Sequence, residues 1–312
     1  MLFVFKVLIV FTICVLCAAY LSLFERKVIA RVQRRLGPSY TGPFGMMQPI
    51  ADILKLFFKR GVLSVYSKRS IISIVALMLC SLMSITMIPI SSDLYIFNPK
   101  FGLLYILVFH TIFTFTEIII GTESGSKYGI IGGFRAYFQA ISSYIPYVLS
   151  ILCVALLTNS FNLIDIVELQ KPVPFIISMF PVFFIFFIVS TITLNRTPFD
   201  FTEAESEIIA GNYVEYGGML FGMLYLCEYI NLVFSASIVS LLFLGGWHSI
   251  PGLSFLPPHI SMFIKITTII VIMILIRAIL PRYKQEHVIR ISWSIFCPAL
   301  VIYFMIFQSI VP

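Results

Sequence analysis

Charged residues are scarce in this chain. Of its 312 residues, 11% are Asp, Glu, Lys or Arg and 60% are apolar, and the mean hydropathy is +1.03. The sequence also lacks a P-loop, a glycine-rich nucleotide loop after a strand and a paired-histidine metal motif. We therefore expect any redox or energy input to come from a partner or from a membrane-soluble substrate. The hydropathy is typical of polytopic membrane proteins.

Cysteine is also sparse, and its placement argues against a metal site. All six cysteines lie in or beside apolar runs, and Cys14 and Cys17 form a C-x-x-C motif that has no second pair. Thiols in such surroundings usually act as small packing residues. We expect no metal ion and no iron–sulfur cluster in this chain.

Runs of about 20 apolar residues recur, and each is long enough to cross a bilayer of roughly 30 Å. They predict an all-α, polytopic membrane protein with about eight transmembrane helices in a single integral-membrane domain over residues 1–312. The sixth run is too long for one straight span, so Gly217, Gly218 and Gly222 predict a tilt, kink or break in it. No convincing internal repeat is present, which disfavours an inverted-repeat transporter. The runs are Leu2–Phe24, Ile71–Ile90, Leu103–Ile120, Tyr137–Leu157, Phe175–Leu194, Tyr213–Leu244, Phe263–Leu280 and Ile291–Val311.

The basic residues are distributed very unevenly between the two sides of these spans. With eight spans, all but four of the 21 Lys and Arg fall on one side, and the exceptions are Lys6, Lys100, Lys171 and Lys265. The positive-inside rule then predicts that both termini lie outside and that the odd-numbered loops lie inside. The net charge of +7 is therefore a topology signal, and without a soluble basic domain we expect no nucleic-acid partner.

The first inside loop predicts an amphipathic helix from Phe44 onward. Such a helix is too short and too charged to span the bilayer, so it should lie at the membrane surface. It could be a lipid-facing anchor, or it could floor a cavity that opens to a lipid-soluble ligand. Its polar face comprises Gln48, Asp52, Lys55 and Lys59, and its apolar face comprises Met47, Ile50, Leu54, Phe57 and Phe58.

The densest group of acids lies in the fifth loop, between Asn195 and Tyr216. Burying carboxylates without partners is costly, so this group points to ion or proton transfer or to a buried interface. Capping is the alternative for part of it, because Thr202 and Glu205 have the spacing of a capping box. The five acids are Asp200, Glu203, Glu205, Glu207 and Glu215.

Other features lie in the third inside loop and within the spans. The loop Gly121–Ala136 contains five glycines and predicts a tight turn with close helix packing. Glu117 and Glu228 lie within apolar runs, where an ionisable group is a functional candidate. His110 shares a helix with Glu117, and a lone histidine there is more often a hydrogen-bonded packing residue.

Six motifs in this order resemble one family over nearly the whole chain: subunit 1 of proton-pumping NADH:ubiquinone oxidoreductase, respiratory complex I. Each motif is weak alone, but the set is highly specific. The motifs are E-R-K with Q-R-R-L-G-P, G-P-F-G-M-M-Q-P-I-A-D-I-L-K-L, S-K-Y-G-I-I-G-G-F-R-A-Y-F-Q-A-I-S, N-R-T-P-F-D-F-T-E-A-E-S-E, C-E-Y and I-R-A-I-L-P-R-Y.

The resemblance implies a subunit without independent activity or a catalytic residue of its own. It would form part of the quinone chamber, with ubiquinone as substrate, and an acidic path to proton translocation. Flavin and iron–sulfur clusters would belong to partner subunits of the peripheral arm, and membrane-arm subunits and lipid would adjoin it. The implied residues are Glu25, Arg26, Arg35 and Asp52 at the chamber, Asp200, Glu203, Glu205, Glu207 and Glu228 on the path, and Arg135, Arg196, Arg277 and Arg282 as charge partners.

Three acids expected from the resemblance are absent, because Arg60, Tyr144 and Thr193 occupy their positions. Glu117 and Glu123 stand where neutral residues are expected, and we hypothesise that Glu117 substitutes for the acid missing at position 144.

Abundant Phe and Ile suggest an organelle-encoded gene and hence the mitochondrial inner membrane, with the termini on the intermembrane side. A bacterial plasma membrane is the alternative.

Three other interpretations compete with this one. The chain could be the homologous subunit of a membrane-bound hydrogenase, which would need no quinone pocket. It could be a stand-alone secondary transporter that couples ions through Glu117 and Glu228. A purely structural anchor would leave the acidic group unexplained.

Overall fold

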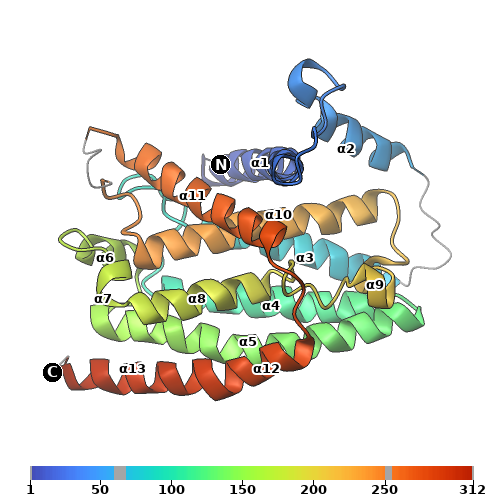
Figure 1. Ribbon diagram of the computed structural model, residues 1–312. Helices are drawn as coiled ribbons and strands as arrows, with labels where there is room; N and C mark the ends of the chain where they lie inside the picture. Colours follow the sequence, from blue (N-terminus) through green and yellow to red (C-terminus); the bar gives the residue numbers. More distant parts are fainter. Residues whose placement is uncertain (1, 60–67, 250–254, 311–312) are drawn as a thin grey trace.

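The computed structural model describes residues 2–59, 68–249 and 255–310, and every regular element within them is helical (Figure 1). The all-α prediction is therefore confirmed. In chain order the elements are α1 (Leu2–Val32), η1 (Pro43–Gly45), α2 (Gln48–Phe58), α3 (Lys68–Thr86), α4 (Gly102–Glu123), α5 (Lys127–Thr158), α6 (Leu163–Leu169), α7 (Phe175–Ser178), α8 (Phe180–Thr193), α9 (Glu205–Ile208), η2 (Gly211–Tyr213), α10 (Met219–Phe243), α11 (Pro258–Ile279), α12 (Gln285–Ile291), η3 (Ser292–Phe296) and α13 (Cys297–Ile310).

Seven helical stretches within the described residues are long and apolar enough to cross a membrane, and α8 is a shorter apolar helix. The prediction of a polytopic protein is confirmed, but the fifth span is not one continuous helix. The run Phe175–Leu194 divides at Met179 into α7 and α8. Pro181 lies in the first turn of α8, where its missing N–H costs nothing, and proline there favours a new helix start over continuation.

Glycines interrupt the sixth run as expected. Gly218 adopts a left-handed φ of 62° immediately before α10, so the helix begins at Met219 and not at Tyr213. Gly222 does not break the chain and lies inside α10.

The third inside loop is much shorter than predicted, because α4 and α5 are separated by only a few residues around Gly125. The other glycines of Gly121–Ala136 lie within the two helices and allow them to approach closely. A Cβ added to Gly121 would lie 2.8 Å from the Cα of Gly133. The predicted close packing is confirmed, whereas the predicted extent of the loop is wrong.

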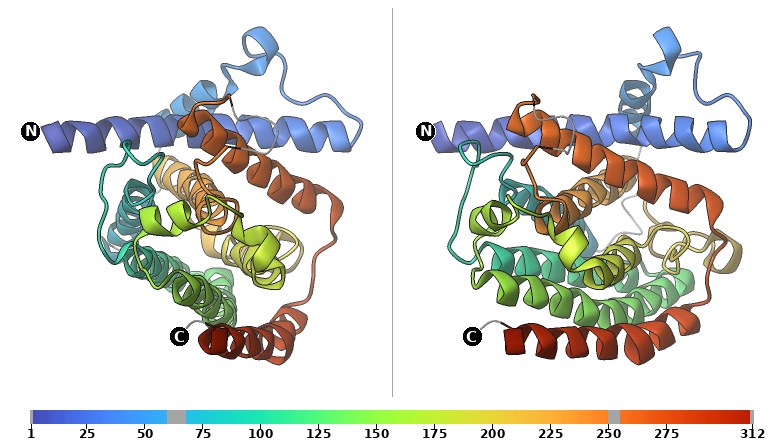
Figure 2. Two further views of the ribbon diagram at one scale, coloured as in Figure 1. Left: turned by 90° about the vertical axis from the view of Figure 1, so that its left-hand side faces the viewer. Right: turned by 60° about the vertical axis from the view of Figure 1, so that its left-hand side comes forward.

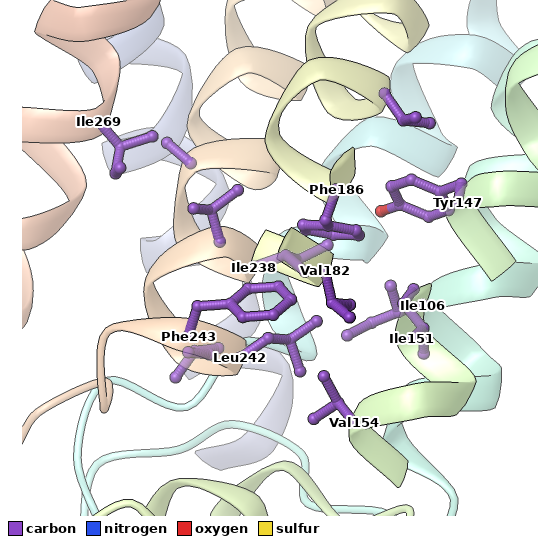
Figure 3. Packing of buried hydrophobic residues seen from close by; sticks show 14 of the residues in the cluster. Ile106, Tyr147, Ile151, Val154, Val182, Phe186, Ile238, Leu242, Phe243 and Ile269 are labelled. Atoms are coloured by element: carbon purple, nitrogen blue, oxygen red, sulfur yellow. The ribbon is translucent and has the colours of Figure 1, made fainter. Parts of the chain in front are cut away.

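The helices form a bundle around α10, the most thoroughly buried of the long helices. Figure 2 shows α1 and α11 along one edge and α12–α13 along the opposite edge. Figure 3 shows the core between them, where the ring of Phe186 on α8 lies between Tyr147 on α5 and Phe243 on α10, with centroid distances of 5.1 and 5.4 Å. This core holds α8 and α10 in fixed register, which fixes the loop that follows α8.

The amphipathic helix of the first inside loop is α2, which projects from the α1 side of the bundle (Figure 1). It begins at Gln48, later than predicted, because Phe44 lies in the separate turn η1 with φ 55°. Leu54, Phe57 and Phe58 are exposed along its apolar face, as expected of a helix at a membrane surface.

Candidate functional site

A buried ion-pair cluster joins distant parts of the chain near the C-terminal end of α1. Glu25 is 2% exposed and accepts a hydrogen bond of 2.8 Å from Nη1 of Arg196, which lies in the loop after α8. It also pairs with Nη1 of Arg277, in the last turn of α11. One carboxylate thus pairs with two guanidinium groups from distant parts of the chain.

Arg196 is held on several sides. Burial alone would lower the pKa of Arg196, but the neighbouring Glu25 raises it above its usual value, so the guanidinium stays charged. Its guanidinium carbon lies 4.3 Å from the ring centroid of Tyr229, a cation–π contact. The hydroxyls of Tyr229 and Tyr225 are 3.0 Å apart on α10, which extends the polar cluster along that helix.

The acidic loop is fixed by two further arginines. Asp200 pairs with Nη2 of Arg282 at 2.5 Å, and Glu207 pairs with Nη1 of Arg135 on α5 at 2.5 Å. Since Arg196 and Arg277 pair with Glu25, all four predicted charge partners contact acids of this chain. The predicted capping box is wrong, because the residue that precedes α9 is Ala204 and it supplies no side-chain cap. Instead, the carboxylate of Asp200 accepts from the backbone N–H of Glu203.

Three carboxylates converge behind this loop. Glu203 faces Glu228 of α10 with Glu117 of α4 nearby, and Tyr213 lies against Glu228. Burial, followed by repulsion from Glu228, raises the pKa of Glu203 well above its usual range. The same two causes raise the pKa of Tyr213. Close acids of this kind titrate as a coupled group and can hold and pass protons.

Glu117 is buried at one end of this group and accepts a hydrogen bond of 2.9 Å from the side chain of Asn195. One oxygen of Glu228, Oε1, is buried and has no hydrogen-bond partner by geometry among the described side chains. Glu123 lies outside the group and pairs loosely with Arg69 at 3.8 Å. Of the two unexpected acids, only Glu117 joins the buried carboxylates.

A cavity of about 560 Å³ opens between α1, α2 and the start of α10. Arg26 and Asp52 line it and form an ion pair of 3.0 Å, while Nε2 of Gln48 donates to Asp52. Tyr225, which contacts Arg26, also lines the cavity and connects it to the buried cluster around Glu25. The hypothesis that α2 floors a cavity is thereby favoured over that of a simple anchor.

The structure does not bring every predicted residue together. Arg35 is exposed and hydrogen-bonds Gln33, away from the cavity. The side chain of Glu205 and all of Arg60 lie outside the described residues. Sequence reasoning missed Tyr225 and Tyr229, and their four-residue spacing beside Glu228 was the available signal, since it places both on one face of α10.

Comparisons with known proteins agree with the sequence motifs. A family model described as NADH dehydrogenase matches residues 5–308. The H subunit of the NADH-quinone oxidoreductase of Orientia tsutsugamushi (strain Boryong) is 38% identical over 307 residues, covering 96% of this chain and 86% of that protein. The second H subunit of Syntrophobacter fumaroxidans is 36% identical over 313 residues, covering 96% and 93%. The H subunit of Neisseria meningitidis serogroup C is 36% identical over 310 residues, covering 94% and 85%. Matched nearly from end to end, the chain belongs to the NADH dehydrogenase family, that of the membrane-bound H subunit of NADH-quinone oxidoreductase.

Proposed function

We propose that this chain is the membrane-arm subunit of a proton-translocating NADH:ubiquinone oxidoreductase that forms part of the quinone chamber and the acidic path to proton translocation. The observation that carries the proposal is a row of ionisable side chains that begins at the cavity and leads into the bundle. Arg26 and Tyr225 at the cavity contact the cluster of Glu25 and Arg196 through Tyr229. The carboxylates of Glu228, Glu203 and Glu117 continue the row.

The cavity suits a quinone because it combines size, shape and polarity. Its volume lies within the range of roughly 300–1,000 Å³ that is usual for small-molecule sites. Apolar side chains such as Leu56, Phe221 and Leu226 would contact the isoprenoid tail, and Arg26 and Asp52 would face the polar headgroup. The electrons would come from flavin and iron–sulfur clusters in partner subunits.

The charge arrangement suggests how quinone chemistry is coupled to proton movement. Reduction of a quinone takes up two electrons and two protons, so charge near the headgroup changes during turnover. Glu25 is tied to Arg196 and Arg277, and Arg196 interacts electrostatically with Glu228. A charge change at the cavity would thereby alter the proton affinity of the acids behind it, which is a coupling free energy between two sites.

The surroundings of the chain follow from the same proposal. A single integral-membrane domain over residues 1–312 would present α2 and the inside loops to peripheral-arm subunits, and the lipid-facing edges to membrane-arm neighbours. We infer the mitochondrial inner membrane from composition, with both termini on the intermembrane side. The three relatives named above are bacterial, so a bacterial plasma membrane is the other setting.

The test is Glu228→Gln in the assembled complex, in sealed membrane vesicles. We expect the variant to assemble but to lose proton translocation, because the amide cannot take up a proton at the centre of the carboxylate group. Asp93→Asn, which alters an exposed acid between α3 and α4, is the matched control and should pump normally. Normal proton uptake by Glu228→Gln, measured with a pH-sensitive dye, would refute the acidic path.

A further inference from the structure

His110 is a buried polar side chain that the proposed function does not use. It lies on α4, two turns before Glu117, and is 3% exposed. Its ring stacks on Tyr147 with a centroid distance of 4.7 Å and on Tyr144 at 6.2 Å, both from α5. Neither ring nitrogen has a hydrogen-bond partner among the described residues. The ring therefore packs as expected, but no described residue supplies the hydrogen bond that a packing histidine usually makes.

A small cavity explains where the unpaired nitrogens can find a partner. The ring of His110 lines it together with Glu117, Gln139 and Asn195. Its volume is about 10 Å³, close to the roughly 10–15 Å³ that one water molecule needs. Buried polar atoms almost always have a partner, and buried waters typically supply two to four hydrogen bonds to such atoms.

Further polar atoms converge on the same space. Gln139 is 2% exposed, and its amide nitrogen donates to the carbonyls of Ile192 and Phe199, which leaves Oε1 as a buried acceptor without a partner among the described residues. Thr114 and Ser143, which carry hydroxyl groups, also line the cavity. Each donates to a backbone carbonyl of its own helix, so its oxygen can still accept from a water.

We propose that this cavity binds an ordered water that hydrogen-bonds His110 and Gln139 and extends the buried carboxylate row from Glu117 to His110. This inference rests on the proposed function, since it adds the next proton acceptor to that row. A proton leaving the Glu117 carboxyl would enter the hydrogen-bonded chain of water and hydroxyl groups. The chain would release a different proton to a ring nitrogen of His110, so no atom or charge is lost. The ring would return to neutrality when its other nitrogen gives up a proton.

The direction of this branch follows from the position of Tyr144, the other titratable group beside His110 that also lines the cavity. Tyr144 is only partly buried, and its hydroxyl donates to the carbonyl of Leu107 on α4. The neighbouring Ile141 and Ile145 on α5 are exposed. The branch would therefore lead from the carboxylate group to the α4–α5 face of the bundle, where a neighbouring membrane subunit could receive the proton.

The test compares His110→Phe with His110→Gln in the assembled complex in sealed vesicles. Phenylalanine keeps the ring stacked on Tyr147 but removes both nitrogens, and glutamine can hold the water but cannot carry a proton. We expect both variants to assemble and to show a loss in the proton-to-electron ratio, since a proton carrier is removed from the row. Normal pumping by either variant would overturn the proposal.

Two further measurements keep the outcome decisive. If Glu228→Gln pumps normally, the acidic path itself fails, whereas loss of pumping in Glu228→Gln with normal pumping in His110→Phe removes only the His110 branch. If neither His110 variant assembles, a map of the wild-type complex at a resolution that shows buried waters decides. Density between His110 and Gln139 would support the proposal, and its absence beside clearly resolved waters elsewhere would refute it.

Discussion

The two ion pairs near the C-terminal end of α1 differ in burial and should differ sharply in what they contribute to stability. Glu25 is 2% exposed and pairs with Arg196, whose side chain is 10% exposed. Asp52 and Arg26 are 35% and 43% exposed. The variant Glu25→Gln leaves Arg196 charged and buried without its counter-ion, whereas Asp52→Asn leaves a solvated arginine.

The expected magnitudes follow from this contrast. Removing one partner of a buried pair costs about 3–5 kcal/mol, because an uncompensated charge remains in the interior. Breaking a solvent-exposed pair costs about 0–1 kcal/mol. At about 2–4 °C per kcal/mol for a large domain, Glu25→Gln should lower the melting temperature by roughly 10 °C and Asp52→Asn by about 4 °C or less.

Thermal inactivation of the solubilised complex, followed on native gels, measures the difference. A double variant, Glu25→Gln with Arg196→Gln, should recover part of the lost stability, because it removes the unpaired buried charge. Equal shifts for Glu25→Gln and Asp52→Asn, or no recovery in the double variant, would show that burial does not govern these pairs.

Three further predictions address the cavity, the acidic loop and the outer end of the bundle. Gly222→Leu should raise the KM for quinone with little effect on assembly. A Cβ added at Gly222 would lie 3.2 Å from the side chain of Leu56, and the rest of the leucine would fill the cavity. Unchanged kinetics would contradict the quinone assignment. Burial, followed by repulsion from Glu228, raises the pKa of Glu203 in the folded protein above its value in the unfolded chain. Ionisation of Glu203 therefore destabilises the fold as the pH rises from the pKa of the unfolded chain through that of the folded protein. Thermal stability should therefore fall with rising pH over that window, and the fall should be smaller in Glu203→Gln, as melting curves across pH would show. Lys265→Met should cost about 1–3 kcal/mol without changing quinone reduction, because Nζ donates to the carbonyls of Gly246 and His248, and an unaltered melting temperature would contradict this.

Local signals in the sequence predicted the elements that depend on local chemistry. The long apolar runs predicted most of the spans, and Gly217 and Gly218 predicted a break in the sixth run but not the residue at which α10 begins. The glycines of Gly121–Ala136 misled, because a glycine needed for close helix packing has the same local signature as one needed for a turn. The spacing of Thr202 and Glu205 misled in the same way, since Asp200 supplies the contact to the loop backbone instead.

Pairing between distant residues could not be read from the sequence. The motifs named Glu25, Arg196 and Arg277 as candidates, but only the fold shows that one carboxylate serves both arginines. The surroundings of the His110 ring depend on which side chains α5 presents to it, and no local pattern contains that information. The exposure of Arg35 likewise depends on where the loop after α1 turns away from the bundle.

The shared carboxylate of Glu25 also sets an order on the biogenesis of this chain. Its partners follow 171 and 252 residues later, so α1 is synthesised long before either arginine exists. Until α11 has been inserted, the inner end of α1 must remain at the aqueous interface or carry a protonated carboxyl, because an unpaired charge in the bilayer is costly. α1 would thus reach its final depth only after helices that are synthesised much later, and truncation before Arg277 would leave α1 without its full set of anchoring contacts.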